Sequence, residues 1–184
     1  MASFIRQIIL ASLLLALITT ACDTPAKTPT STPESTQIPP TATPSSNTLS
    51  SLTSQQYMEK AYKDSIEGEY QKAIANYDEA IRLDPQYAKA YYNRGLTYSH
   101  IGQYDKSVQD YTEAIRFDPQ PNTYLGRGIS YNVLGESDRA VQDFDEAIRL
   151  DPQYTKAYYN RGVSYNVLGL SELAIQDFDE AIRL

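Results

Sequence analysis

The sequence predicts an all-α solenoid of about four stacked helix pairs. Residues 162–184 match residues 128–150 at 18 of 23 positions, at an offset of 34. The prolines Pro85, Pro119 and Pro152 follow nearly the same period. Each unit also places apolar residues at helical spacing, which indicates amphipathic helices. A period of this length is typical of stacked helical repeats.

The N-terminal segment predicts export. Arg6 precedes an apolar run of eleven residues, 8–18. As a helix this run would span about 16 Å, which is too short for a hydrocarbon core of about 30 Å. We therefore interpret residues 1–21 as a signal peptide and not as a transmembrane helix.

The junction after this segment resembles the lipobox of bacterial lipoproteins, in which a cysteine is acylated and becomes the mature N-terminus. Ala21 and Cys22 fit that pattern, whereas Thr19 stands where the family usually has Leu. The resemblance implies that acyl chains such as palmitate on Cys22 anchor an exported protein to the outer face of a bacterial cell membrane. Cleavage near Ala21 without lipidation, giving a secreted protein, is the alternative.

Residues 22–53 are predicted to be the lipidated cysteine and a disordered tether. Between residues 23 and 50 there are six prolines and thirteen Ser or Thr residues. Such a composition buries too little apolar surface to offset the entropy of ordering, and its prolines favour extended chain. We expect the folded part to begin near Ser54.

Residues 54–184 divide into four predicted repeats, whose boundaries are 54–87, 88–120, 121–154 and 155–184. An Asp-Pro pair ends the second helix of each of the first three repeats, because proline disfavours the α conformation in the residue before it. Glycine falls between the two helices of each pair, where a left-handed residue commonly ends a helix. The expected helices are 54–67, 70–83, 88–101, 104–117, 121–134, 137–150, 155–168 and 171–184.

This repeat resembles the tetratricopeptide repeat (TPR), and the resemblance covers the whole of this C-terminal part, 54–184. The third unit carries the family pattern in full, as Tyr124, Gly128, Tyr131, Gly135, Ala140, Phe144, Ala147 and Pro152. The first unit departs from it at Asp64 and the second at Ser107. The resemblance implies a right-handed superhelix whose first helices line a concave surface that binds proteins or peptides.

Composition argues against catalysis and against nucleic acid as a partner. The net charge of −7 lacks the basic excess that phosphate neutralisation requires. A single histidine, His100, and a single cysteine leave no internal disulfide and no common metal site or catalytic triad. We expect no enzyme activity, cofactor or metal. Two alternatives are an accessory domain of a larger enzyme or assembly, whose catalytic part lies beyond Leu184, and a spacer that binds nothing.

Charge patterning predicts a mildly basic concave groove. In repeats two to four the first helices carry five basic residues and no acid, whereas the second helices carry eleven acids against five bases. A basic groove favours an extended or acidic peptide. The arginines Arg94, Arg127 and Arg161 could equally well pair inside the fold with acids such as Asp110 and Asp143.

Asparagine supplies the second signal for a binding site. Asn93 and Asn160 occupy the same repeat position, and an amide there can donate to and accept from a peptide backbone. The third repeat departs from this pattern with Gly126. The predicted groove residues are Lys89, Tyr92, Asn93, Leu96, Asn132, Lys156, Tyr159, Asn160 and Asn166.

The fourth repeat suggests self-association. Leu170 and Leu173 stand where earlier repeats have charged or polar residues, although terminal repeats of a solenoid normally become more polar. We expect this edge to dock onto a further repeat of a longer chain or onto a second copy.

Overall fold

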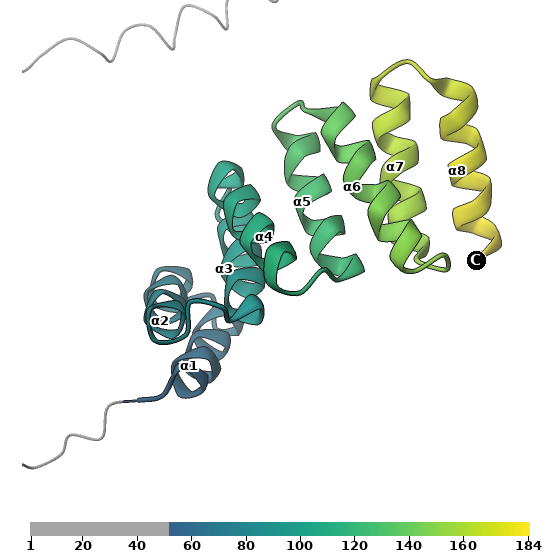
Figure 1. The fold of residues 1–184 in the computed structure, drawn as a ribbon. Helices are drawn as coiled ribbons and strands as arrows, with labels where there is room; N and C mark the ends of the chain where they lie inside the picture. The colour runs from purple at the N-terminus through teal and green to yellow at the C-terminus, as the bar shows by residue number, and fades with distance from the viewer. Residues whose placement is uncertain (1–51) are drawn as a thin grey trace, which may run out of the picture. The chain divides into compact units, whose positions relative to one another are not determined.

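The computed structural model describes residues 52–184, which fold into eight helices without a strand (Figure 1). The predicted signal peptide, Cys22 and nearly all of the predicted tether lie outside the described residues. The helices are α1 (Ser54–Ile66), α2 (Tyr70–Leu83), α3 (Ala88–His100), α4 (Tyr104–Phe117), α5 (Pro121–Val133), α6 (Ser137–Leu150), α7 (Thr155–Val167) and α8 (Ser171–Arg183). Every helix begins at its predicted residue. Five of them, α1, α3, α5, α7 and α8, end one residue earlier than predicted.

Glycine ends the first helix of each pair, as predicted. Gly102 has a φ of 75°, in the left-handed region that costs glycine little. Its amide donates to the carbonyl of Ser99 at 3.0 Å, and the amide of Gln103 donates to that of Tyr98 at 2.9 Å. These bonds satisfy carbonyls that the helix leaves without a partner and reverse the chain into α4.

The second helices stop at the Asp-Pro pairs, which confirms the predicted breaks. Asp84, Asp118 and Asp151 are all extended, with ψ values of 92°, 93° and 95°. This is the conformation that a following proline favours. The connection to the next repeat is therefore short, and successive helix pairs stack side by side (Figure 1).

Contacts between helices define the inside of the curve. Each helix packs against its neighbours in sequence, and the first helices also contact each other, α1 with α3, α3 with α5 and α5 with α7. Among the described residues no two second helices touch. Because the first helices lie closer together than the second helices, α1, α3, α5 and α7 are on the concave side. The described residues thus form the predicted all-α solenoid.

Glycines inside the first helices allow close helix packing. A Cβ on Gly128 would lie 2.6 Å from Cε1 of Phe144, and one on Gly162 would lie 2.7 Å from Cε1 of Phe178. The aromatic side chain of each second helix thus lies directly against the backbone of its partner helix. Tyr77, Tyr111 and Phe144 are at most 1% exposed and form the core with the small residues around them.

Tyr98, one of the aromatic residues of the repeat pattern, does not belong to this core. It is half-buried, and Lys106 approaches its ring to 5.2 Å from the centroid. The tyrosine sits at the margin of the helix pair, where a cation from the second helix covers its face.

Phe144→Ala should lower the free energy of unfolding by about 3–5 kcal/mol, because it opens a cavity at a fully buried position. Tyr98→Ala should cost clearly less, since Tyr98 is already partly solvated. Urea denaturation followed by circular dichroism measures both, and equal losses would contradict the difference in packing.

Alkaline pH should destabilise the fold through Tyr77. Burial raises the pKa of Tyr77 to about 12, whereas an unfolded tyrosine has a pKa of about 10. Between these values the unfolded chain loses the proton and the folded chain keeps it, so stability falls as pH rises. Tyr77→Phe should reduce this fall, measured as melting temperature against pH. An unchanged pH dependence would exclude Tyr77 as its source.

Candidate functional site

Two hollows on the concave side occupy the same place in repeats two and four. The first has a volume of about 280 Å³ and the second about 490 Å³. The first is lined by Ala88, Lys89, Tyr92, Asn93, Ala114, Asp118, Gln120, Asn122 and Thr123. The second is lined by Thr155, Lys156, Tyr159, Asn160, Phe178, Ala181 and Ile182. Six of the nine predicted groove residues thus come together as two equivalent sets of lysine, tyrosine and asparagine.

The two hollows differ in how far they are enclosed. In the first, the start of α5 forms one wall through Asn122 and Thr123. In the second, α7 and α8 are the only walls among residues 52–184, and the aromatic ring of Phe178 is half-exposed where Tyr111 is buried. The second hollow is therefore wider and more apolar than the first.

Asn93 and Asn160 use part of their hydrogen-bonding capacity inside their own helices. The Nδ2 of Asn93 donates to the carbonyl of Lys89, and that of Asn160 donates to the carbonyl of Lys156, both at 2.7 Å. Asn93 is only 9% exposed. These bonds use one N–H of each amide and orient the side chain on its own helix.

Asn132 takes part in packing between repeats. Its Nδ2 lies 2.8 Å from Oγ of Ser164, which joins α5 to α7. The same position one repeat earlier is Ser99, whose hydroxyl lies 3.4 Å from that of Ser130. Asn166 is the equivalent residue of the fourth repeat and is exposed, as is Leu96 on α3. The structure therefore does not bring Asn132, Asn166 and Leu96 into either hollow.

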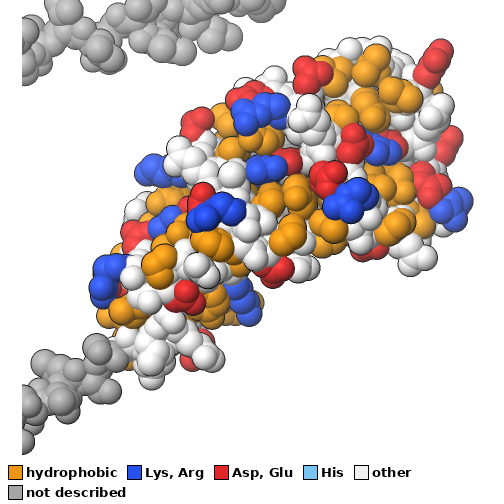
Figure 2. Space-filling model, in the orientation of Figure 1, with side chains coloured by type: hydrophobic (Ala, Val, Ile, Leu, Met, Phe, Trp, Pro, Cys, Tyr) orange, Lys and Arg blue, Asp and Glu red, His pale blue; other side chains and the backbone are white. Residues whose placement is uncertain are grey.

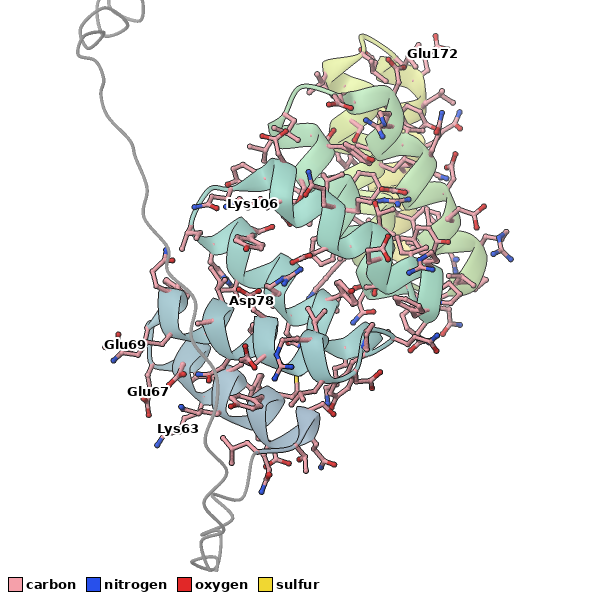
Figure 3. All side chains as sticks on the ribbon, turned by 60° about the vertical axis from the view of Figure 1, so that its left-hand side comes forward. Lys63, Glu67, Glu69, Asp78, Lys106 and Glu172 are labelled. Carbon is pink, nitrogen blue, oxygen red and sulfur yellow. The ribbon has the colours of Figure 1, made fainter. Side chains whose placement is uncertain are left out.

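Arginine 94 joins two repeats. Its Nε and Nη2 donate to the two carboxylate oxygens of Asp110 on α4, at 2.7 and 2.6 Å. Its Nη1 donates to Asp78 on α2 at 2.5 Å, and Figure 3 shows Asp78 extending from that helix. One planar guanidinium thus holds both the helix that pairs with its own and the second helix of the preceding repeat.

The other two arginines repeat the arrangement. Arg161 donates to Asp177 at 2.8 and 2.7 Å and to Asp145 at 2.5 Å. Arg127 donates to Asp143 at 2.9 and 2.6 Å, but its third contact is the hydroxyl of Thr112 at 3.0 Å. Each of the three arginines, Arg94, Arg127 and Arg161, thus makes three such contacts, and we call each set of three an arginine clamp.

The clamps decide the alternative that the sequence left open, in favour of pairing inside the fold. The hydrogen bond to Asp177 raises the pKa of Arg161, and burial opposes that rise without cancelling it. The aspartates are nearly enclosed, since the side chain of Asp110 is 6% exposed. Charge on the first helices is therefore largely neutralised at the arginines. Lys89 and Lys156 form no ion pair with any residue of the described part.

The arginines and aspartates of the clamps are regularly spaced in the sequence. The aspartates lie 16 residues before and after Arg94, at Asp78 and Asp110, and 16 residues after Arg127. This spacing is meaningful only once two helices are antiparallel and a third packs beside them. The helical pattern alone did not indicate it.

Comparisons with known proteins identify the repeat. A family model described as TPR repeat matches residues 66–102 and 128–169, and models described as tetratricopeptide repeat match residues 88–121 and 155–184. The chain contains tetratricopeptide repeats. The residues that carried the sequence resemblance lie largely within these matches. A search of curated proteins gives no match.

Solved TPR proteins have the same fold. A crystal structure of MamA is 24% identical, with a TM-score of 0.69, and the match covers 71% of this chain and 77% of that one. MamA from Desulfovibrio magneticus RS-1 is 20% identical, with a TM-score of 0.68 and coverage of 71% and 75%. The first TPR of Spaghetti (RPAP3), bound to the HSP90 peptide SRMEEVD, is 21% identical, with a TM-score of 0.62 and coverage of 64% and 94%.

The TPR helices have no membrane-spanning character. None of those in residues 52–184 is both long enough and apolar enough to cross a bilayer. In the same part of the chain, no group of three His, Cys, Asp or Glu side chains is placed to hold a metal ion.

Arg94→Ala should lower the free energy of unfolding by about 3–5 kcal/mol, because it leaves the buried carboxylate of Asp110 without its partner. Arg116→Ala is the matched control, since Arg116 pairs with Glu113 on the surface of one helix. Such an exposed pair contributes at most about 1 kcal/mol. Denaturant titration of both variants measures the difference, and comparable losses would contradict a structural role for the clamp.

Proposed function

We propose that this chain is a non-catalytic TPR scaffold that binds an extended acidic peptide of a partner protein along its concave side. The observation that carries the proposal is the repeated set of lysine, tyrosine and asparagine in the two hollows. All other cations on the first helices of repeats two to four are held in the arginine clamps. Lys89 and Lys156 are thus the charges that this surface keeps for a ligand.

Each member of the set has a distinct role in holding a peptide. The ammonium group of Lys89 or Lys156 pairs with a carboxylate of the ligand. The ring of Tyr92 or Tyr159 provides apolar area beside it, and Tyr159 is 56% exposed. The free amide oxygen and N–H next to it accept from and donate to the peptide backbone. The peptide of the RPAP3 complex, which ends in Glu-Glu-Val-Asp, belongs to the same chemical class.

Repeat three separates the two sets for a structural reason. Gly126 stands where the asparagine would be, and a Cβ there would lie 2.6 Å from Cζ of Tyr111. A larger side chain would collide with the core of repeat two. The site is therefore bipartite, with one set at α3 and one at α7, and an extended ligand is needed to reach both.

The combined variant Lys89→Glu and Lys156→Glu should abolish capture of the partner without unfolding the chain, because both lysines are exposed and unpaired in the described part. The full chain serves as bait against solubilised native membranes, and captured proteins are identified by mass spectrometry. Lys72→Glu is the control, since Lys72 lies on the convex helix α2 and pairs only with Glu69. Equal recovery by all three baits would overturn the proposed groove.

We further propose that the scaffold is held at the outer face of a bacterial cell membrane by acylation of Cys22. The support is the short apolar run, the Ala21-Cys22 junction and the tether composition. A lipidated cysteine followed by an extended segment would hold the TPR array away from the membrane surface, within reach of soluble partners.

Cys22→Ser should move the protein from the membrane fraction to the soluble fraction, because it removes the acylated thiol. Mass spectrometry of the mature N-terminus provides the direct measurement, with an acylated cysteine as the first residue. An unmodified N-terminus at another residue would exclude the lipoprotein and favour the secreted alternative.

A further inference from the structure

Every junction between repeats is joined by polar links of two kinds. In the first, the arginine of a first helix binds an acceptor on the preceding second helix, as Arg94 binds Asp78 and Arg161 binds Asp145 at 2.5 Å. In the second, successive first helices share a hydrogen bond. This bond joins Ser65 to Thr97, Ser99 to Ser130 and Asn132 to Ser164, at 3.5, 3.4 and 2.8 Å.

The edge formed by α7 and α8 presents the carboxylate of the first link and the amide of the second, which can accept as well as donate. Asp179 occupies in the fourth repeat the position that Asp145 has in the third; it is exposed, and no described residue pairs with it. Asn166 likewise occupies the position of Asn132 and is also exposed. At the junction of repeats three and four, Asp145 and Asn132 are bonded to the following repeat.

Apolar side chains are exposed on the same edge. Ile182 is 83% exposed, whereas its equivalents in the first three repeats are half-buried. Phe178 is half-exposed, although the equivalent aromatics are buried. Figure 2 shows hydrophobic side chains also at the turn between α7 and α8. This edge has the apolar character of an internal junction that nothing covers within the described residues.

The opposite edge, formed by α1, presents the complementary halves. Lys60 occupies in the first repeat the position of the clamp arginines, and it has no ion pair within residues 52–184. Lys63 occupies the position of Thr97, and its contact with Glu67 is long, at 3.8 Å, and exposed. Its side chain points away from the helix pair (Figure 3). Both positions therefore carry cations that are available to acceptors.

We infer that a second copy of this chain stacks head-to-tail on the first, with its α1 edge against the α7–α8 edge. Lys60 of one copy then pairs with Asp179 of the other, and Lys63 donates to the amide oxygen of Asn166. The two polar links of the internal junctions continue across the boundary between copies, and Ile182 and Phe178 become covered. The inference goes beyond the peptide groove, although Phe178 and Ile182 also line the second hollow, so the second copy would lie beside that hollow.

Charge distinguishes this arrangement from a symmetric one. Two α7–α8 edges facing each other would leave each Asp179 without a cation from α1. The head-to-tail contact instead gives each acceptor a cation. Because the two surfaces are different, the contact does not close on a dimer, and longer assemblies form as concentration rises.

Packing sets the strength of the contact. Gln56 stands where Ala90 and Ala157 are fully buried at the internal junctions. The larger polar side chain prevents equally close packing, so the association is reversible and depends on concentration.

Leu170 and Leu173 lie at the turn into α8 and are 45% and 40% exposed. The third repeat has an ion pair between Glu136 and Arg139 at these positions. The inferred contact thus uses Asp179 and its apolar surroundings, and not the two leucines.

Analytical ultracentrifugation of the full chain over a wide concentration range tests the inference. Every sample carries Cys22→Ser, so that no acyl chain contributes. We expect the average mass to rise with concentration beyond that of a dimer. Lys60→Glu alone and Asp179→Lys alone should each weaken association about tenfold or more, because like charges then face each other. Unchanged melting temperatures confirm that both variants fold.

Mixing the two variants gives the decisive result. In an equimolar mixture, the glutamate introduced at position 60 of one variant meets the lysine introduced at position 179 of the other. The remaining contact in the mixture is the native one, so association should return. Lys72→Glu and Asp105→Lys, the matched controls at exposed positions away from both edges, should associate like the native sequence.

Three results would overturn the inference. The first is a monomer at every concentration. The second is association that Lys60→Glu leaves unchanged, which would mean that two α7–α8 edges meet. The third is a mixture that remains as weakly associated as its components, which would show that Lys60 and Asp179 do not face each other.

Discussion

The structure depends on a guanidinium group that binds aspartates on two different helices. Arg94 and Arg161 each fix their own helix pair and, through the third contact, the orientation of the preceding repeat. A planar fork with several donors can satisfy two carboxylates at once, which an ammonium group cannot do with the same directionality. The desolvation of these charges is tolerable because each nearly buried carboxylate receives two hydrogen bonds. The clamps thus join successive repeats and pair the arginines inside the fold.

Packing and binding compete for the same positions on the first helices. In repeats two and four, Asn93 and Asn160 can be accommodated at the concave surface. In repeat three, the ring of Tyr111 requires Gly126 at that position, and Thr112 replaces the aspartate of the clamp. The third repeat therefore connects the two proposed binding sets without forming a third. The bipartite character of the proposed site follows from the core of its neighbour.

Local signals in the sequence specified the helices, and contacts between distant residues specified the site. Asp-Pro pairs and left-handed glycines act within a few residues, so every helix start could be predicted. The neutralisation of Arg127 by Asp143 requires two helices to pack, and so does the bond of Asn132 to Ser164. The sequence offered the first only as one of two alternatives and did not indicate the second. Lys89 and Lys156, which the sequence suggested as groove residues, line the two hollows and form no ion pair with any described residue.

A solenoid can specify assembly by charge at little cost to its own folding. Lys60 and Asp179 are exposed in the single chain, so water solvates them and their lack of partners within residues 52–184 is not destabilising. The apolar surface around Phe178 and Ile182 supplies association energy but little direction, because it would accept many surfaces. The charges supply the direction, since they favour one edge and repel the other. The pairing of a cation with an acceptor joins the repeats within a chain. The same pairing therefore selects which edge of a second chain can follow.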